Sequence, residues 1–539
     1  MLNSKASGIL LHPTSLPSPY GIGDLGTEAY RFIDFLAEGF QKLWQVLPLG
    51  PTGYGNSPYL CYSALAGNPL LISLEKLRDN GWLTDEDLNQ LPEFPVEYVD
   101  YELVITTKMP LLLKANNNFQ ANPSPQVKEK FKQFCSKNKE WLDDYSLFMA
   151  IKETNHGASW HKWEKSIANR EPDTIKRWKT RLKDKINFQK FLQFQFFSQW
   201  QELKNYANHR GISILGDLPI YVAHDSVDVW ANPEIFCLDE RTGEAALMAG
   251  VPPDYFSATG QLWGNPVYNW DKLMETDFQW WVKRFQGMLD CVDLIRIDHF
   301  RGFEAFWAVP QGEATAVNGE WIQAPGEALF YRVNEKLAKL PIVAEDLGVI
   351  TPEVEALRDK FQFPGMKVLQ FAFDSGPGNP FLPHNYQNSN CIVYTGTHDN
   401  NTTVGWFEER SPEEKARVTD YLGNMDSEEG INWSLIRLAL NSNAVQAIFP
   451  LQDILGLGSQ GKMNQPGVTG GNWQWRYQVG DLKEELSDRL KHLTYLHNRS
   501  PKSIFQMWLN EEEYEKLKST ASKKSQTLTQ LLREYIKEL

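Results

Sequence analysis

The sequence of 539 residues has little cysteine, no long apolar run and no excess of basic residues, and each absence excludes a class of protein. The cysteines stand apart in the chain, without a CxxC pair or metal-like spacing, which disfavours a disulfide scaffold and a zinc site. They are Cys61, Cys135, Cys237, Cys291 and Cys391. We expect them to be reduced thiols that pack like small apolar side chains.

No stretch approaches the roughly 18 apolar residues of a membrane span. The amino-terminal sequence MLNSKASGILLHPTSLP has an apolar run too short for a signal peptide. The formal net charge of -14 disfavours nucleic acid or an anionic membrane as the main partner, because both bind basic surfaces. We therefore expect a cytoplasmic protein that binds neither of them.

Two glycine-rich stretches, at residues 21–26 and 456–461, fit the GxGxxG pattern of a nucleotide-binding loop. A proline-rich segment separates the first from the preceding apolar run, where the fingerprint needs a tight turn. The second lacks the hydroxyl residue of a phosphate loop, because Met463 stands in its place. Flexible loops explain both stretches more simply than a nucleotide site does.

The sequence is rich in short apolar runs that end in polar or charged residues. Such near-continuous apolar runs are typical of parallel strands that are covered on both faces. Helical patterns at 27–40 and 351–361, with Thr27 and Thr351 as expected caps, separate some of these runs. The fold class predicted is α/β, a (β/α)8 TIM barrel with helical and loop insertions, whose active site lies at the carboxyl-terminal mouth. An open doubly wound sheet is the alternative. The runs end at His12, Asp217, Asp298, Glu345 and the pair His398–Asp399.

The chain also contains two regions that differ from this pattern. Residues from about 105 to 205 are charged and helical, around an expected loop at 115–125 with the sequence ANNNFQANPSP. We expect this region to be a helical insertion in a catalytic barrel of residues 1–509. Residues 510–539 are expected to form a carboxyl-terminal helical extension of one or two helices.

The stretch CVDLIRIDHF places charged residues where a buried strand is expected. Arg296 and Asp298 lie two residues apart and therefore share a face, and the arginine would keep the carboxylate ionised. Glu345 follows the apolar run LPIVA, a setting that raises the pKa of an acid. An ionised carboxylate, a protonated one and a third at Asp399 match the needs of retaining glycosidic chemistry. The excess of aromatic residues, 19 Trp, 20 Tyr and 29 Phe, would suit a ligand that offers sugar faces.

Each of these motifs has a simpler interpretation when it is taken alone. Arg296 and Asp298 could form only a structural ion pair, and Asp346 could cap a helix beside an exposed Glu345. The THDN stretch could be an ordinary turn. A metal bound by His299, His398 and Asp399 is a further alternative, but no HxH or HExxH spacing supports it.

Several long motifs together resemble one family, the 4-α-glucanotransferases known as amylomaltase or disproportionating enzyme, which are relatives of the α-amylase superfamily. The motifs include SGILLHPTSLPSPYGIGDLG, GDLPIYVAHDSVDVW, LIRIDHFRG, AEDLG, GTHDNNTTVGW and MNQPGVTGGNWQWR, and the resemblance extends to about residue 509. It implies that Asp298 is the nucleophile, Glu345 the acid/base and Asp399 the transition-state stabiliser. The resemblance further implies substrate-binding roles for Ser57, Tyr59, Asp217, Asp254, Gln261, Trp263, Arg296, His299, Asp374, His398 and Asn464, and a secondary glucan site at Tyr54 and Tyr101, with packing as the alternative for Tyr101.

The resemblance implies transfer of α-1,4-glucan segments between malto-oligosaccharides, with no metal and no cofactor, since side chains supply all the chemistry. A hydrolase that uses water as the acceptor is the nearest alternative, because composition does not distinguish the two acceptors. A glucan-binding protein without activity is the alternative from another class, and the three carboxylates argue against it.

Overall fold

The structure is a computed structural model that describes residues 4–253, 257–423, 429–468, 470–500, 509–524, 526–528, 531–532 and 534–535. The chain divides into two compact units, one that extends to Ser500 and one that begins at Pro501. Each unit is described by itself below.

The larger unit is built on a sheet of eight strands whose successive pairs are all parallel. Strands that follow one another among these eight along the chain are neighbours in the sheet, which is the order of a (β/α)8 barrel. The predicted fold class is therefore confirmed. The strands are β1 Ala6–Leu10, β2 Leu43–Gln45, β3 Ser213–Pro219, β6 Leu294–Asp298, β9 Ile342–Ala344, β10 Gly365–Val368, β11 Cys391–Tyr394 and β12 Gln446–Pro450.

The two end strands of this sheet, β9 and β10, close the barrel at a seam. The N–H of Ala344 donates to the carbonyl of Pro364 at 2.9 Å. Beside this bond, the carboxylate of Asp346 accepts the N–H of Met366 at 2.7 Å and pairs with Arg358. Asp346 therefore caps no helix. Its side chain joins the two strands, which contradicts the interpretation of this stretch as a capping turn.

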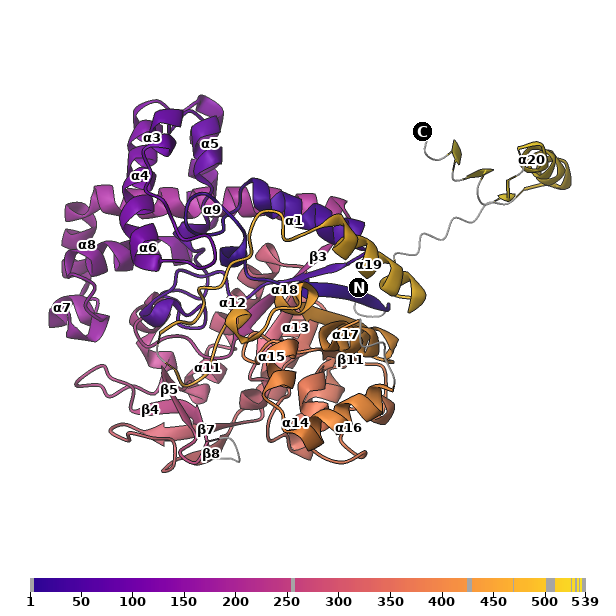
Figure 1. Cartoon of the computed structure of the whole chain (residues 1–539). Coiled ribbons are helices and arrows are strands. Elements are labelled where there is room, and N and C mark those ends of the chain that lie inside the picture. The colour runs from indigo at the N-terminus through magenta and orange to yellow at the C-terminus, as the bar shows by residue number, and fades with distance from the viewer. Residues whose placement is uncertain are drawn as a thin grey trace. The chain divides into compact units, whose positions relative to one another are not determined.

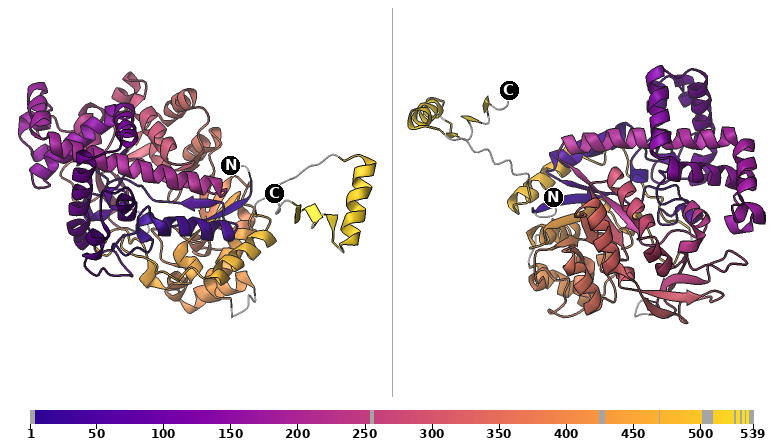
Figure 2. Two further views of the ribbon diagram at one scale, coloured as in Figure 1. Left: turned by 90° about the horizontal axis from the view of Figure 1, so that it is seen from above. Right: turned by 180° about the vertical axis from the view of Figure 1, so that it is seen from behind.

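Helices surround the strands and cover the outer face of the barrel (Figures 1 and 2). The helix that follows β9 has Thr351 at its cap position and Pro352 as its first residue, as predicted. The helix expected to have Thr27 as cap instead has Gly26 at the cap position, and Thr27, its first residue, donates to Glu75. The main helices around the strands are α1 Thr27–Glu38, α12 Gln279–Cys291, α13 Gly326–Leu337, α14 Pro352–Lys360, α15 Thr403–Glu408, α16 Pro412–Leu422, α17 Ile431–Asn441, α18 Leu451–Leu455 and α19 Glu484–Leu496.

The barrel interior is filled by apolar side chains from all eight strands, and they belong to a single buried cluster. Such a packed interior separates the two ends of the barrel. Residues two positions after three of these side chains share the inward face, and they are Asp217, Arg296 and Glu345. The cluster therefore forms the floor under the charged residues. Its strand members are Leu10, Leu43, Leu215, Leu294, Val343, Met366, Val368, Ile392, Tyr394 and Ile448.

A helical region is inserted between β2 and β3 and lies on one side of the barrel (Figure 1). The loop predicted at 115–125 is wrong, because helix α4 continues to Ala121. Ala115, Asn116 and Phe119 are buried against the rest of the region, and this packing outweighs the poor helix propensity of the asparagines. The insertion comprises α2 Leu74–Asp79, α3 Asp85–Asn89, α4 Tyr101–Ala121, α5 Pro125–Lys137, α6 Lys139–Thr154, α7 Lys165–Ala168, α8 Pro172–Arg181 and α9 Lys183–His209.

A second, antiparallel sheet of four strands is built from segments that follow β3 and β6. Helices α10 Val227–Ala231 and α11 Trp270–Glu275 flank it in the chain. Its strands are β4 Leu247–Val251, β5 Gln261–Pro266, β7 Ala305–Pro310 and β8 Glu320–Gln323.

In the carboxyl-terminal unit, the described residues include the helix α20 Glu511–Lys523, which Asn510 and Glu513 begin with a capping box. A second helix, expected around Leu528 to Tyr535, falls partly outside the described residues. None of the helices in the described ranges is both long and apolar enough to cross a bilayer. The five cysteines are free thiols, of which only Cys391 is fully buried.

Candidate active site at the barrel mouth

The predicted site residues come from the carboxyl-terminal ends of four barrel strands. Asp217 lies near the end of β3, and Asp298 is the last residue of β6. Glu345 follows the last residue of β9, and His398 and Asp399 lie in the turn after β11. Because parallel strands in a barrel end at one rim, residues far apart in the chain meet at a single mouth.

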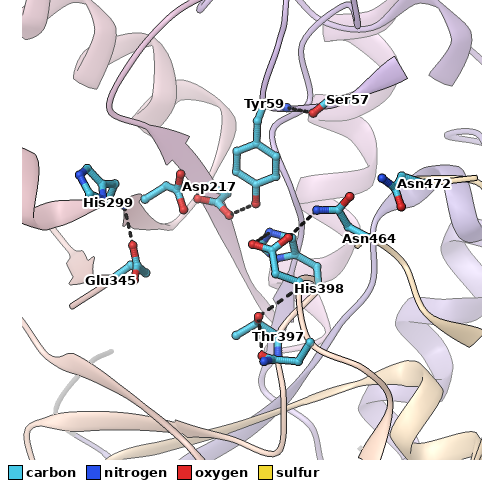
Figure 3. A network of polar contacts seen from close by, with 12 residues as sticks. Ser57, Tyr59, Asp217, His299, Glu345, Thr397, His398, Asn464 and Asn472 are labelled. Atoms are coloured by element: carbon cyan, nitrogen blue, oxygen red, sulfur yellow. Dashed lines mark hydrogen bonds and ion pairs between the residues drawn. The ribbon is translucent and has the colours of Figure 1, made fainter. Parts of the chain in front are cut away.

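Arg296 holds two of the carboxylates. Its Nη1 atom lies 2.7 Å from both oxygens of Asp217 and 3.0 Å from Oδ1 of Asp298. The hydroxyl of Tyr59 donates to Asp217 at 2.8 Å, as Figure 3 shows. Arg296 and Asp217 are buried, whereas 29% of the Asp298 side chain is exposed toward the mouth. Of the two carboxylates, Asp298 is therefore the one open to a ligand.

Glu345 is oriented by the backbone on both sides. One oxygen accepts the N–H of His299 at 2.7 Å (Figure 3). The other accepts the N–H of Leu347 at 2.9 Å. His299 has a left-handed backbone, with φ of 53°, which turns the chain sharply after the strand. Burial, assisted by Asp298 and opposed by Arg296, raises the pKa of Glu345 to about 7. At neutral pH the site therefore holds a proton on this carboxyl group in a substantial share of molecules.

Asp399 is held by a different set of groups. Nε2 of His398 lies 3.4 Å from Oδ2 of Asp399, and the amide of Asn464 donates to Oδ1 at 2.6 Å (Figure 3). Burial alone would raise the pKa of Asp399, but His398, Asn464 and Arg296 together lower it to about 2. The same contact raises the pKa of His398 above its usual value, against the effect of its own burial. Asp399 is therefore an anion across the physiological pH range.

Aromatic rings line the same side of the mouth. The rings of Tyr59 and His398 are stacked, with centroids 5.2 Å apart and an interplanar angle of 16°. Trp473 packs behind both, at 5.8 Å from Tyr59 and 6.0 Å from His398. Trp473 was not among the predicted site residues, although it lies in the motif MNQPGVTGGNWQWR, because only the fold brings it to the mouth.

Other predicted binding residues lie on the antiparallel sheet beside the mouth. The ring of Trp263, on β5, meets the ring of His299 edge to face at 4.9 Å. The indole N–H of Trp263 donates to Gln261 at 3.2 Å, and Gln261 is exposed. These residues extend the site from β6 onto the second sheet. Asp254 lies outside the described residues.

The remaining predicted residues differ in how they are placed. Ser57 accepts the backbone N–H of Tyr59 at 3.2 Å and so orients the loop that carries this tyrosine. Asp374 lies in the segment after β10, where it pairs with Arg410 at 3.0 Å. Tyr54 is 78% exposed, as a stacking residue would be.

Tyr101 is placed differently from what its predicted stacking role requires. Its side chain is only 6% exposed, and its hydroxyl donates to the carbonyl of Trp473 at 2.9 Å. The ring packs with Ile22, Leu70 and Val104. Tyr101 therefore offers no free face to a sugar, and the packing alternative holds for this residue.

A metal site finds no support in this geometry. Across the described ranges, no group of three His, Cys, Asp or Glu side chains is arranged to hold a metal ion. His299 meets Trp263, whereas His398 contacts Asp399. What the mouth does offer is a carboxylate beside an arginine, a carboxyl group whose pKa is raised to about 7, and a third whose pKa is lowered to about 2.

This chain is similar to known proteins of one family. A family model described as 4-alpha-glucanotransferase matches residues 11–483. A 4-alpha-glucanotransferase of Synechocystis sp. is 62% identical over 500 residues, which cover 93% of this chain and 99% of the relative. One of Thermus thermophilus is 50% identical over 492 residues, with coverage of 90% and 97%. A solved structure, the amylomaltase from Streptococcus agalactiae in complex with acarbose, is similar with a TM-score of 0.89 at 42% identity, and the match covers 92% of this chain and 100% of that one. The chain belongs to the 4-alpha-glucanotransferase family.

Proposed function

We propose that this enzyme transfers α-1,4-glucan segments from a donor to the 4-hydroxyl of an acceptor glucan or glucose by a retaining double displacement. Asp298 attacks the anomeric carbon while Glu345 donates its proton to the departing glycosidic oxygen. A covalent glycosyl-enzyme forms on Asp298. Glu345, now ionised, then takes the proton of the incoming hydroxyl, and attack by this oxygen releases Asp298. Retaining chemistry of this kind needs the two carboxyl groups about 5–5.5 Å apart.

One observation carries this assignment of roles: the two carboxyl groups have different surroundings. Burial raises the pKa of Glu345 to about 7, whereas Asp298 lies 3.0 Å from a buried guanidinium. Two acids whose environments separate their protonation states are the arrangement that acid and nucleophile require. Asp399, anionic at neutral pH, lies where it can stabilise positive charge on the sugar ring.

The binding residues follow from their places around this centre. Asp217, Tyr59 and Arg296 form a polar wall for sugar hydroxyls beside Asp298. Trp263 offers an indole on the other sheet, and Tyr54 offers an exposed ring for a second glucan contact. Ser57, Asp254, Gln261, His299, Asp374, His398 and Asn464 complete the proposed substrate-binding set. We further assign the catalytic unit to residues 1–509, cytoplasmic action on malto-oligosaccharides, and residues 510–539 to a separate helical extension.

Incubation with pure maltotriose, followed by separation of the products by chain length, tests this proposal. Transfer predicts glucose together with maltopentaose and longer chains. Glucose and maltose without longer products would mean that water is the acceptor and that the enzyme is a hydrolase. If neither maltotriose nor longer donors react, the protein binds glucans without acting on them.

A further inference from the structure

Trp473 has a backbone conformation that a bulky residue adopts only when its surroundings impose it. Its φ is 64°, in the left-handed region, which costs free energy for a residue with a large side chain. Two hydrogen bonds hold it there. Its N–H donates to the carbonyl of Met463 at 2.8 Å, and its own carbonyl accepts the Tyr101 hydroxyl at 2.9 Å. The second bond ties Trp473 to the helical insertion, because Tyr101 is the first residue of α4.

The ring that this backbone presents packs against the site. Trp473 is 6% exposed, and its ring lies beside the stacked pair of Tyr59 and His398. Tyr59 in turn donates to Asp217, and His398 contacts Asp399. A shift of the indole would therefore move Tyr59 and His398, and with them the contacts that these residues make with Asp217 and Asp399.

An aromatic face beside an imidazole favours the charged form of that imidazole. His398 is flanked by two such rings, those of Tyr59 and Trp473, and its contact with Asp399 raises its pKa against the effect of burial. The charged and titratable groups around His398 are Asp399 after β11, Arg296 on β6, Asp217 on β3, His12 after β1 and Tyr59 in the loop after β2. Trp473 carries no charge of its own, so it affects His398 through its π electrons alone.

We propose that Tyr101 is a positioning residue, whose hydroxyl fixes Trp473 against His398 and thereby supports the His398–Asp399 pair. This inference rests on the proposed role of Asp399 as transition-state stabiliser. It gives Tyr101 a role in the chemical step in place of a role in glucan stacking. The hydroxyl acts through Trp473 and does not itself touch the glucan.

The variant Tyr101→Phe removes only the hydroxyl. We expect kcat on maltotriose to fall by roughly 3- to 10-fold, the equivalent of one buried hydrogen bond, with KM nearly unchanged. The NMR titration midpoint of the His398 ring, identified by its absence in His398→Gln, should move to lower pH. Tyr386→Phe is the matched control, because it also removes a hydroxyl that donates to a backbone carbonyl, that of Phe381 at 3.2 Å. It should change neither readout.

A second pair of variants keeps the test independent of how Tyr101→Phe folds. Trp473→Phe retains an aromatic ring and should keep the His398 midpoint near that of the wild type, whereas Trp473→Leu should lower it. If Trp473→Leu leaves the midpoint unchanged, the inference is overturned. It is also overturned if Tyr101→Phe raises KM for long glucans and leaves the midpoint unchanged, because Tyr101 would then be a glucan contact. Either result leaves the maltotriose products of the wild type intact, so the proposed function is tested separately.

Discussion

The two sides of the barrel mouth hold their carboxylates by different means. On the β3 and β6 side, one buried guanidinium contacts Asp217 and Asp298 at 2.7 and 3.0 Å. On the β11 side, an imidazole and an amide contact Asp399 at 3.4 and 2.6 Å. On the first side, the positive charge of Arg296 is present at every working pH, because a guanidinium does not deprotonate in proteins. On the second side, the charge of the His398 imidazole depends on pH.

This difference separates two tasks at one site. The proposed nucleophile Asp298 lies beside a permanent positive charge, that of Arg296. The proposed stabiliser Asp399 is paired with His398, whose charge depends on pH, so the strength of that pairing varies with pH. The following predictions test whether the two sides behave in these different ways.

The largest effect is expected from Asp298→Asn, which removes the nucleophile and keeps its shape. Turnover should fall by roughly 10⁴-fold or more, the scale seen when a catalytic nucleophile is lost. Product formation from maltotriose measures the loss, while circular dichroism and glucan binding should remain close to the wild type. Near-normal turnover in this variant would remove the proposed mechanism.

Arg296→Met should be the most destabilising change on the arginine side, because it leaves buried Asp217 without its partner. The free energy of unfolding should fall by about 3–5 kcal/mol at pH 9 and by less at pH 6, because the loss of Arg296 favours protonation of Asp217 and Glu345, whose pKa values burial already raises. Urea unfolding at both pH values measures this. Arg31→Met, which breaks an exposed pair with Glu28, is the control and should have no measurable effect. A loss that is larger at pH 6 than at pH 9 would contradict the permanent-charge interpretation.

Glu345→Gln should abolish acid catalysis, a loss of roughly 10²- to 10⁴-fold, and should also change how stability depends on pH. The folded pKa of Glu345, about 7, is above its unfolded value of about 4.5, so ionisation penalises the folded state. The wild type should therefore lose stability relative to Glu345→Gln between pH 4.5 and 7, by roughly 2–3 kcal/mol. Unfolding curves of both proteins at pH 4.5 and pH 8 provide the comparison. If the difference in unfolding free energy between the two proteins is the same at pH 4.5 and at pH 8, the pKa of Glu345 is not raised.

His398→Gln tests the titrating side. The raised pKa of His398 means that its stabilising contact with Asp399 is complete below pH 6.5 and is lost as pH rises through the folded pKa. The variant should therefore be destabilised more at pH 6 than at pH 9, in contrast to Arg296→Met, and kcat should fall roughly 10²-fold. Equal losses at both pH values would mean that His398 is neutral in the folded enzyme.

The smallest effect is expected from Tyr54→Ala, because Tyr54 belongs neither to the charged group around Arg296 nor to that around His398. An exposed residue without buried contacts changes the free energy of unfolding by less than about 0.5 kcal/mol. Loss of a stacking face should raise KM for long glucans by roughly 2- to 10-fold. Initial rates with long-chain amylose test this, and an unchanged KM would remove Tyr54 from the proposed second site.

The sequence predicted best the features that depend on strand periodicity. Alternation along CVDLIRIDHF places Arg296 and Asp298 on one face, and the structure shows them in contact. The apolar run before Glu345 predicted its raised pKa, because burial is the leading cause of the shift. Both predictions need only local pattern and the rule that barrel sites lie at strand ends.

The errors come from residues whose surroundings are set by distant segments. The asparagines at 116–118 signal a loop, but the helix continues because its neighbours bury Phe119. Asp346 has the sequence of a helix cap, yet its partner is the N–H of Met366, twenty residues later. The contact between Tyr101 and Trp473 spans 372 residues. No local pattern contains that information.

The seam between β9 and β10 gives the catalytic acid an unusual neighbour. Asp346, next to Glu345 in the chain, accepts a hydrogen bond from Met366 at this seam. The seam joins the two end strands of the parallel sheet. Regions with fewer backbone ladder bonds open at lower free energy than the rest of a fold. The amide of Met366 should therefore exchange with deuterium sooner than its counterparts on β1 and β12. Heating would then separate Glu345 from Asp399, which follows β11 across the seam, before the barrel melts, and activity would be lost while most of the fold persists.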